Sequence, residues 1–516
     1  MTDDHVAGRT PHERWFWLGA SALFAVVFVV AHRGPSGQAG HPTTLAGPVL
    51  LWLGLLPWLA GWWAAAAGLG WALSRGLEQP GRPPWAWPLR LALGGAALML
   101  LTWLVAVAGG LRPIPMAALI AAGLGLAAFA WRRESVRPGP EQGDAWGNPK
   151  PLPTGRVALA CAAPLALLAV AVTLPAGSLW STEAYGYDVL SYHLNLPRQW
   201  VAAGGLVETE HDVYGYLPSL VEVAFAQFMS LRGTEPSAVY LAQGFHASWA
   251  VLAAWLVGGF VRRVGSSATA GALAAGVMLA VPWVLVTGSM AYNEMVVVAL
   301  AAAAAWLALE PPPCLKSWRL GMAVGLAVGA ATLAKLTAGF MVAVPIGLML
   351  LITRRWSAAA VAGAAGTLVL TPYLIRNAAW TGNPVFPFAT GWLGAGHWTP
   401  ALTQRWDAGH GLADGETFSV PSLLRQWLLN SGYGAIGGRA TPIETQNIAR
   451  FPREYGVPAL WLSVLAAAPI VWRRHRGFRT SDHWRFAFVA SLCLVFWLAL
   501  QLAFWFVLTH QQSRFL

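Results

Sequence analysis

Residues 51–73 read LWLGLLPWLAGWWAAAAGLGWAL and contain no charged side chain. A helix needs about 20 predominantly apolar residues to cross the hydrocarbon core of a bilayer. This run is long enough to cross, and similar runs recur along the chain. The sequence therefore predicts an all-α, polytopic membrane protein.

The composition of the whole chain points the same way. Of the 516 residues, 56% are hydrophobic and 11% are charged, and the mean hydropathy is +0.52. A soluble domain carries about 25% charged residues, so a soluble enzyme, a disordered chain and a disulfide scaffold are excluded. The 30 tryptophans suit a chain with many membrane–water interfaces. We attribute the net charge of +11 to arginines in cytoplasmic loops and expect no nucleic-acid partner.

Apolar runs of sufficient length predict about thirteen membrane spans. They cover residues 15–31, 45–73, 89–109, 114–131, 157–176, 236–261, 268–286, 291–309, 320–334, 338–353, 358–375, 456–472 and 486–508. A linker rich in Pro and Gly, residues 132–156, separates an N-terminal four-helix region, residues 1–131, from a core, residues 157–516. The first four spans hold almost no ionisable residue away from their ends, so we expect them to be scaffold.

The basic residues predict the orientation of these spans. If the N-terminus is cytoplasmic and the spans alternate, the shorter cytoplasmic segments hold most of the 33 basic residues. Such an excess is typical of cytoplasmic loops. This topology leaves two long external loops, residues 177–235 and 376–455, and places most acidic residues outside.

The first external loop opens with SLWSTEAYGYDVLSYHLNLPRQW, residues 178–200. Asp188 lies here among possible substrate-binding side chains, which are Tyr187, Tyr192 and His193. If residues 188–203 form one helix on the outer leaflet, Asp188 and Tyr192 share a face because they are four residues apart. On spacing alone, Asp188 could equally be a solvated loop carboxylate.

The same loop continues with HDVYGYLPSLVEVAFAQFMSLRG, residues 211–233. Pro218 suits the first turn of a helix, which would place Glu222 one turn inside an apolar segment. We expect a re-entrant or surface helix packed on the loop. His211 and Tyr214 either line a pocket or make structural contacts.

A second carboxylate, Glu294, follows the short outer turn TGSMAYN and opens an apolar helix. A negative charge is stabilising at a helix N-terminus, and that role alone could explain the residue. The alternative is a functional carboxylate that faces Asp188 across a cavity.

Cations on the outer side oppose the general distribution of charge. Lys335 lies in GAATLAKLTAGF, Arg376 and Asn377 follow TPYLI, and Arg514 lies in the tail. A single such cation can extend its charged end to the lipid headgroups. Three of them beside carboxylates indicate instead a site for a lipid-linked phosphate, to which Arg offers a fork of donors and Lys a point charge.

Several of these stretches carry a resemblance to a known family. They are Tyr187-Asp188 with Tyr192-His193, the segment from His211 to Glu222, Ala291–Glu294, Arg376-Asn377 with the following TGNPVFPF, and Ser513–Leu516. In their order and common outer placement the chain resembles the GT-C superfamily of membrane glycosyltransferases. The likeness is to its protein-mannosyltransferase-like bacterial branch, which depends on polyprenyl-phosphate sugars.

The resemblance implies a helical membrane core with a large first external loop of juxtamembrane helices. It also implies a bacterial cell membrane and transfer of a sugar from a polyprenyl-phosphate donor to a lipid, glycan or protein acceptor. An acidic residue near the start of the first loop is the base in such enzymes. Asp188 fits best, and Glu183 competes because the loop lacks a plain Asp-Glu pair. Two features depart from the family: the four preceding helices, and a tail that ends where relatives continue.

These residues suggest an inverting transfer on the outer face. Asp188 would accept the proton of the acceptor hydroxyl, while Lys335, Arg376 and Arg514 would stabilise charge on the departing phosphate. Glu294 and His193 would position acceptor or sugar. Carboxylates and phosphate suit Mg²⁺ or Mn²⁺, although no ligand spacing demands a metal.

Two other functions stay open at this point. A transporter or flippase of a lipid-linked sugar also uses charged residues in a membrane cavity. A non-catalytic membrane subunit of a glycan-assembly complex would use the loops as binding surfaces.

Overall fold

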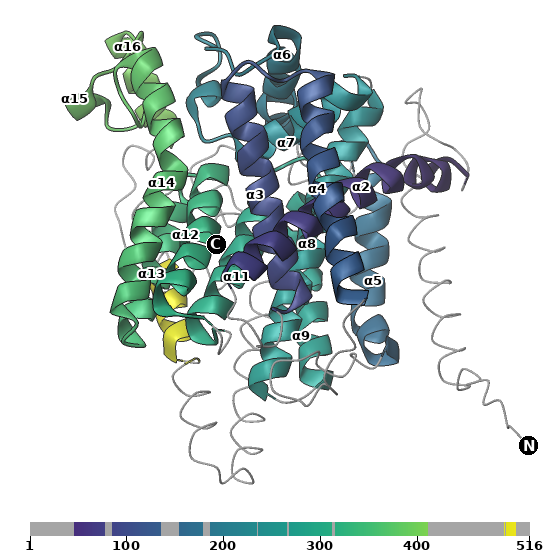
Figure 1. Cartoon of the computed structure of the whole chain (residues 1–516). Coiled ribbons are helices and arrows are strands. Elements are labelled where there is room, and N and C mark those ends of the chain that lie inside the picture. The colour runs from purple at the N-terminus through teal and green to yellow at the C-terminus, as the bar shows by residue number, and fades with distance from the viewer. Residues whose placement is uncertain are drawn as a thin grey trace, which may run out of the picture.

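A computed structural model describes nine stretches of the chain, and every element in them is helical (Figure 1). The stretches are residues 46–77, 85–135, 154–178, 186–234, 236–265, 268–311, 315–410, 490 and 492–501. The all-α prediction is confirmed for this part of the chain. Several predictions lie outside the described residues: the spans 15–31 and 456–472, most of the linker, Glu183, Arg514 and the loop beyond residue 410.

Helices of 7 to 32 residues form a bundle. They are α2 (Ala46–Leu77), α3 (Trp87–Val107), α4 (Pro113–Ser135), α5 (Thr154–Val172), α8 (Pro236–Gly265), α9 (Ala268–Ala280), α10 (Pro282–Gly288), α11 (Glu294–Leu309), α12 (Ser317–Ala334), α13 (Val344–Ile352) and α14 (Trp356–Thr381). The other described elements are η2 (Val189–His193), α6 (Asn195–Ala203), η3 (Val213–Tyr216), α7 (Leu220–Arg232), η4 (Gly339–Ala343), α15 (Thr390–Leu393) and α16 (Pro400–His410).

Six of the described helices are long and apolar enough to cross a membrane. Their spans are Pro48–Leu77, Trp87–Val107, Pro113–Arg133, Ser237–Val264, Ser317–Ala334 and Trp356–Thr381. Five further apolar helices are shorter: Cys161–Val172, Ala268–Ala280, Glu294–Leu309, Gly339–Ile352 and Leu492–Gln501. These helices support a membrane protein, whereas the count of thirteen stays a prediction.

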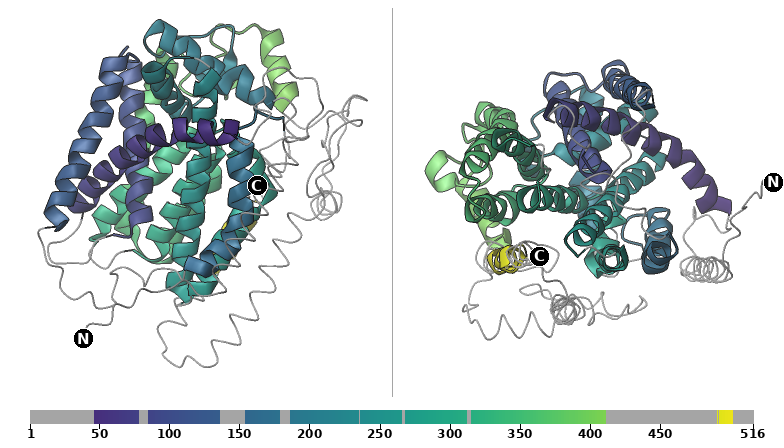
Figure 2. Two further views of the ribbon diagram at one scale, coloured as in Figure 1. Left: turned by 90° about the vertical axis from the view of Figure 1, so that its right-hand side faces the viewer. Right: turned by 60° about the horizontal axis from the view of Figure 1, so that its bottom comes forward.

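Proline shapes two of the predicted spans. The run 268–286 is divided into α9, which ends at Ala280, and α10, which begins at Pro282, because proline has no amide hydrogen with which to continue a preceding helix. Helix α2 runs obliquely across its neighbours and is curved, as both views of Figure 2 show, and Pro57 lies inside it.

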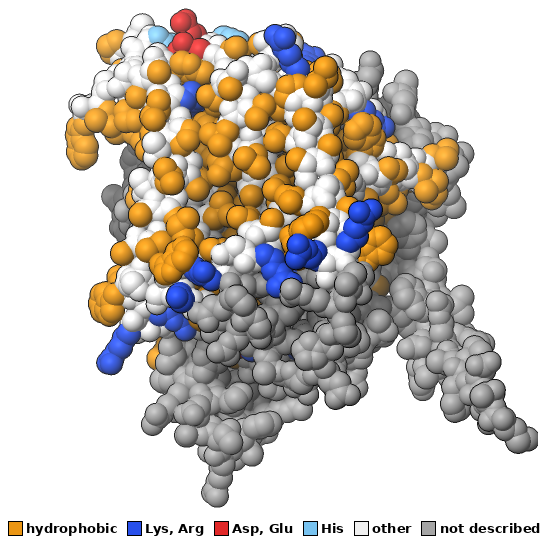
Figure 3. Space-filling model, in the orientation of Figure 1, with side chains coloured by type: hydrophobic (Ala, Val, Ile, Leu, Met, Phe, Trp, Pro, Cys, Tyr) orange, Lys and Arg blue, Asp and Glu red, His pale blue; other side chains and the backbone are white. Residues whose placement is uncertain are grey.

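The two ends of the bundle differ in charge. Arginines in the last turns of α2, α4 and α8 mark what we call the basic end: Arg75, Arg132, Arg133, Arg262 and Arg263. The other end, called the acidic end, is built from residues 186–234, 289–293 and 382–410. Figure 3 shows most of the visible Lys and Arg side chains low on this face, whereas Asp, Glu and His lie at its upper edge together with a smaller group of Lys and Arg. This asymmetry agrees with the pattern from which the orientation is predicted.

Close packing of α12 against α14 fixes the position of one site residue. A Cβ added at Gly325 would lie 2.5 Å from Ala365 Cβ, and one at Gly329 would lie 2.8 Å from Val369 Cβ. Small residues allow such close approach of membrane helices. The packing therefore holds the C-terminal end of α12, where Lys335 follows, against the bundle.

Candidate functional site

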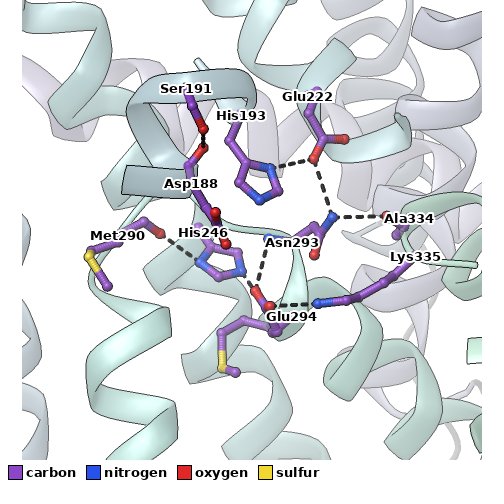
Figure 4. Close-up of polar contacts among 11 residues, drawn as sticks. Asp188, Ser191, His193, Glu222, His246, Met290, Asn293, Glu294, Ala334 and Lys335 are labelled. Carbon is purple, nitrogen blue, oxygen red and sulfur yellow. Dashed lines mark hydrogen bonds and ion pairs between the residues drawn. The ribbon is translucent and has the colours of Figure 1, made fainter. Parts of the chain in front are cut away.

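The segment that carries Asp188 is helical, but it is not the single α-helix expected over residues 188–203. Residues Val189–His193 form a π-helical turn, which the Leu194 N–H closes by donating to Val189 O at 2.9 Å. Helix α6 then begins at Asn195. The π-helical turn brings His193 to the side of Asp188 (Figure 4).

His193 contacts a carboxylate from the next helix in the chain. Its Nδ1 lies 2.7 Å from Glu222 Oε1, and both side chains are buried. Glu222 stands in the first turn of α7, as the sequence suggested, although Pro218 precedes this helix rather than starting it. The contact ties η2 to α7 across the acidic end.

Asn293 joins this pair to the end of α12. Its Nδ2 donates to Glu222 Oε1 at 3.2 Å and to Ala334 O at 3.1 Å. Both partners are acceptors, so the orientation of the amide is determined. Asn293 belongs to a stretch that carries the family resemblance, yet neither it nor Glu222 was predicted as a site residue.

The outer turn before α11 is held by a histidine that sequence reasoning missed. His246 of α8 has Nδ1 2.8 Å from Met290 O and 3.1 Å from Thr287 O, and its Nε2 accepts from Met295 N at 2.9 Å. Nδ1 therefore carries the hydrogen, and the buried ring is neutral. A histidine inside the apolar run 236–261 was the signal that could have identified it.

Glu294 and Lys335 form an ion pair at this end. Lys335 Nζ donates to Glu294 Oε1 at 2.7 Å, and the Asn293 N–H donates to Glu294 Oε2 at 3.3 Å. Glu294 is also the first residue of α11, so its carboxylate both stabilises the N-terminus of that helix and pairs with a cation. Lys335 is extended, with φ −153° and ψ 121°, where the chain leaves α12.

Asp188 points toward the same group of residues. Its side chain is half-buried, and Figure 4 shows its carboxylate directed toward Asn293, Glu294 and the His246 ring. We call this group the polar cluster; its members are Asp188, His193, Glu222, His246, Asn293, Glu294 and Lys335. It unites four residues that were predicted from the sequence with three that were not.

Arg376 and Asn377 lie in a separate network on the other side of η3. Arg376 Nη2 donates to Tyr216 O at 3.1 Å and to Asn377 Oδ1 at 2.8 Å. Its guanidinium carbon lies 4.7 Å from the ring centre of Trp380. Asn377 Nδ2 donates to Tyr216 O at 2.8 Å and to Phe386 O at 3.1 Å. The structure therefore gives both residues a role in attaching η3 to α14, and Arg376 Nη1 is buried with no hydrogen-bond partner among the described residues.

Tyrosines connect the two networks. Tyr192 stacks on Tyr214 with ring centres 4.1 Å apart, and it lies 4.2 Å from the His193 ring. Asp212 accepts from the Tyr214 N–H at 3.0 Å at the start of η3. Burial raises the pKa of Asp212, and this hydrogen bond opposes the shift. The stack places Tyr214 beside the polar cluster while Tyr216 contacts the Arg376 network.

Other predicted residues lie away from the polar cluster. Tyr187 is 75% exposed, and His211 is also exposed. Among the residues that the structure describes, no group of three or more His, Cys, Asp or Glu side chains is placed to hold a metal ion. The Mg²⁺ or Mn²⁺ that the sequence allows without demanding therefore has no dedicated ligand set in this part of the chain.

Comparison with known proteins identifies one region of similarity. Residues 294–410 are similar to a family described as a domain of unknown function (DUF8201). No curated protein and no solved structure matches the chain. The similar region begins at Glu294 and includes Lys335, Arg376 and Asn377, whereas the η2–α7 half of the polar cluster precedes it.

Proposed function

We propose that this chain is a membrane glycosyltransferase. It would transfer a sugar, with inversion, from a polyprenyl-phosphate donor to a lipid, glycan or protein acceptor on the outer face of a bacterial cell membrane. The observation that carries the proposal is the meeting of Asp188, Glu294 and Lys335 at one end of an apolar bundle. These residues come from three distant segments, and ionisable groups in such a place are typical of functional sites.

The reaction assigns a role to each of the three. Asp188 accepts the proton of the acceptor hydroxyl as its oxygen attacks the anomeric carbon, and the bond to the lipid phosphate breaks. Lys335 stabilises the charge on the departing phosphate. An ammonium has three N–H donors, so Lys335 can hold Glu294 and a phosphate oxygen together. Glu294 keeps the ammonium in place.

Residues around the cluster would bind the substrates. Tyr192 and Tyr214 present stacked rings beside it, and Tyr187 and His211 lie exposed on the same loop. Arg376, through its buried Nη1, and Arg514 remain candidates for a phosphate contact. The Arg376 network already satisfies other donors of the guanidinium, so Lys335 is the stronger candidate.

A transporter or flippase of the same lipid-linked sugar is the second candidate. One observation favours it: the helical path breaks at residues 335–338, between α12 and η4, and the break carries Lys335. Transporters commonly bind their substrates at broken helices. A flippase would move the donor between leaflets without breaking its sugar–phosphate bond, and a non-catalytic subunit would do neither.

The test is sugar transfer by the purified full chain in detergent, where no sealed bilayer separates two sides and transport cannot contribute to the signal. Labelled polyprenyl-phosphate hexose and pentose donors are supplied with an extract of membrane lipids and glycans as acceptor. We expect Asp188→Asn to lower turnover by about 10²-fold or more, and Glu183→Gln to cost less. Glu210→Gln, an exposed carboxylate of the same loop, is the matched control and should leave turnover unchanged.

Three results would change the proposal. No cleavage of any donor by the wild-type chain would reject the enzyme in favour of a transporter or subunit. Normal turnover in Asp188→Asn would reject the assigned base. If turnover were normal in Asp188→Asn and absent in Glu183→Gln, the base would be Glu183.

A further inference from the structure

The buried contact between His193 and Glu222 determines where the histidine carries its hydrogen. Glu222 Oε1 accepts from Asn293 Nδ2 and lies 2.7 Å from His193 Nδ1. A carboxylate oxygen can only accept here, so Nδ1 donates. In the neutral ring, Nε2 then holds a lone pair and can take a proton.

The π-helical turn directs that second nitrogen to Asp188. On an α-helix, residues five apart point in directions about 140° apart. The i→i+5 hydrogen bond of η2 instead brings His193 over Asp188. Figure 4 shows the ring edge opposite Glu222 facing the Asp188 carboxylate. Short π-helical turns are frequent at functional sites.

In the described part of the chain, Glu222 has few hydrogen-bond partners apart from the His193 ring and Asn293. Glu222 Oε2 is buried and has no hydrogen-bond partner among the described residues, so the carboxylate is satisfied only through Oε1. A buried charge with few hydrogen bonds is costly unless an opposite charge lies beside it. An imidazolium at His193 would supply that charge.

We propose that His193 is a proton relay for Asp188 and that Glu222 is its positioning residue. This inference rests on the proposed function. The acceptor hydroxyl gives its proton to Asp188 as the new carbon–oxygen bond forms, and the electron pair of the breaking bond leaves with the phosphate. No hydrogen bond or ion pair joins His193 to Asp188 directly (Figure 4), so the proton then passes from the Asp188 carboxyl group through one bridging water to His193 Nε2. Asp188 is again a carboxylate, and the imidazolium beside Glu222 later releases the proton to water.

Other charged and titratable groups that face His193 do not replace it in this role. Tyr292 packs edge-on at 5.1 Å, and Tyr192 packs at 4.2 Å. Glu294 is paired with Lys335. Both nitrogens of His246 are engaged by backbone groups.

The test is a double-mutant cycle on turnover in the transfer assay. In His193→Asn, the amide nitrogen can still donate to Glu222, but nothing replaces Nε2 as a base. We expect a loss of about 10²-fold in turnover with little change in the KM for the donor. Because both residues act on one proton, His193→Asn should cause little further loss in an Asp188→Asn background. His397→Asn, an exposed histidine of the same end, is the matched control.

A second measurement covers the case in which His193→Asn fails to fold. His193→Ala opens space for added imidazole, and turnover should recover with imidazole concentration, which a purely structural role would not allow. Near-normal turnover in His193→Asn would overturn the relay. A double variant whose loss of turnover equals the product of the two single losses would overturn it too. If His193→Asn does not fold, absence of imidazole rescue would overturn it. A wild-type chain that transfers no sugar would instead overturn the proposed function.

Discussion

Removal of the Lys335 ammonium should destabilise the fold as well as weaken donor binding. Lys335 Nζ lies 2.7 Å from Glu294 Oε1, and the two side chains are 23% and 11% exposed. At an effective dielectric constant of about 20, two unit charges at this 2.7 Å separation attract by about 6 kcal/mol. Loss of hydration offsets several kcal/mol of that attraction.

Lys335→Met removes the charge but keeps the length of the side chain. It leaves a mostly buried carboxylate, which still has the Asn293 N–H and the N-terminus of α11. We therefore expect the free energy of unfolding to fall by about 2–4 kcal/mol, somewhat less than for a fully buried pair. Lys335→Met/Glu294→Gln removes both charges and should recover about 1–2 kcal/mol.

The assay is unfolding of the purified chain in mixed micelles with a rising fraction of a denaturing detergent. Lys316 is the other lysine of the described residues and is exposed, so Lys316→Met should change the free energy by less than about 0.5 kcal/mol. Equal losses in Lys335→Met and the double variant would show that the pair contributes nothing. Donor affinity, measured in parallel, should fall about 10–150-fold if Lys335 also contacts phosphate.

Three further predictions concern other parts of the chain. Arg376→Lys should lower stability and turnover together, because a point charge cannot replace the guanidinium contacts to Tyr216 O and Asn377; unchanged melting with lost donor affinity would indicate a direct phosphate contact instead. Cysteines at exposed positions within 198–211 should react with an impermeant reagent on intact cells, and those within 140–150 should not; the reverse labelling would invert the topology. Asp212→Asn should be neutral or stabilising at pH 7, because the raised pKa of Asp212 reflects the cost of burying its charge. That charge forms as pH rises, so the wild-type chain should lose stability relative to the variant between acidic and neutral pH. Thermal melts of both chains across this pH range would show the difference.

The apolar runs located the six described helices that are long enough to cross a membrane, but not the interruptions of other runs. The run 268–286 is apolar throughout, and only the position of Pro282 shows where α9 gives way to α10. No pattern of residue types marks the π-helical turn at η2, because the turn depends on how the segment packs against α7. The directions of the side chains that follow Asp188 could therefore not be predicted from the sequence.

The same limit applies to the polar cluster. Glu294 and Lys335 could be found because each is an ionisable residue at the end of an apolar run. His246 stands out in the sequence only as a histidine inside an apolar run, and its partners are backbone groups that no side-chain pattern identifies. Asn293 bonds to Glu222 and to Ala334 O, residues from two distant segments, so its role could not be found from local sequence. Arg376 was predicted to contact a lipid phosphate because it is a cation of the outer side, and that stays a prediction. Its hydrogen bond to Tyr216 O joins segments 160 residues apart, which no local pattern predicts.

The short helices of the core have a consequence for the surrounding lipid. Helices α11 and α12 have 16 and 18 residues, or about 24 and 27 Å of rise, whereas α14 has 26 residues, or about 39 Å. A hydrocarbon core is about 30 Å thick, so α14 is long enough to cross it, whereas α11 and α12 are each somewhat shorter. A bilayer that these two helices cross must thin beside them, or water must fill the difference. Turnover in reconstituted vesicles should therefore depend on acyl-chain length, and thicker bilayers should slow the reaction.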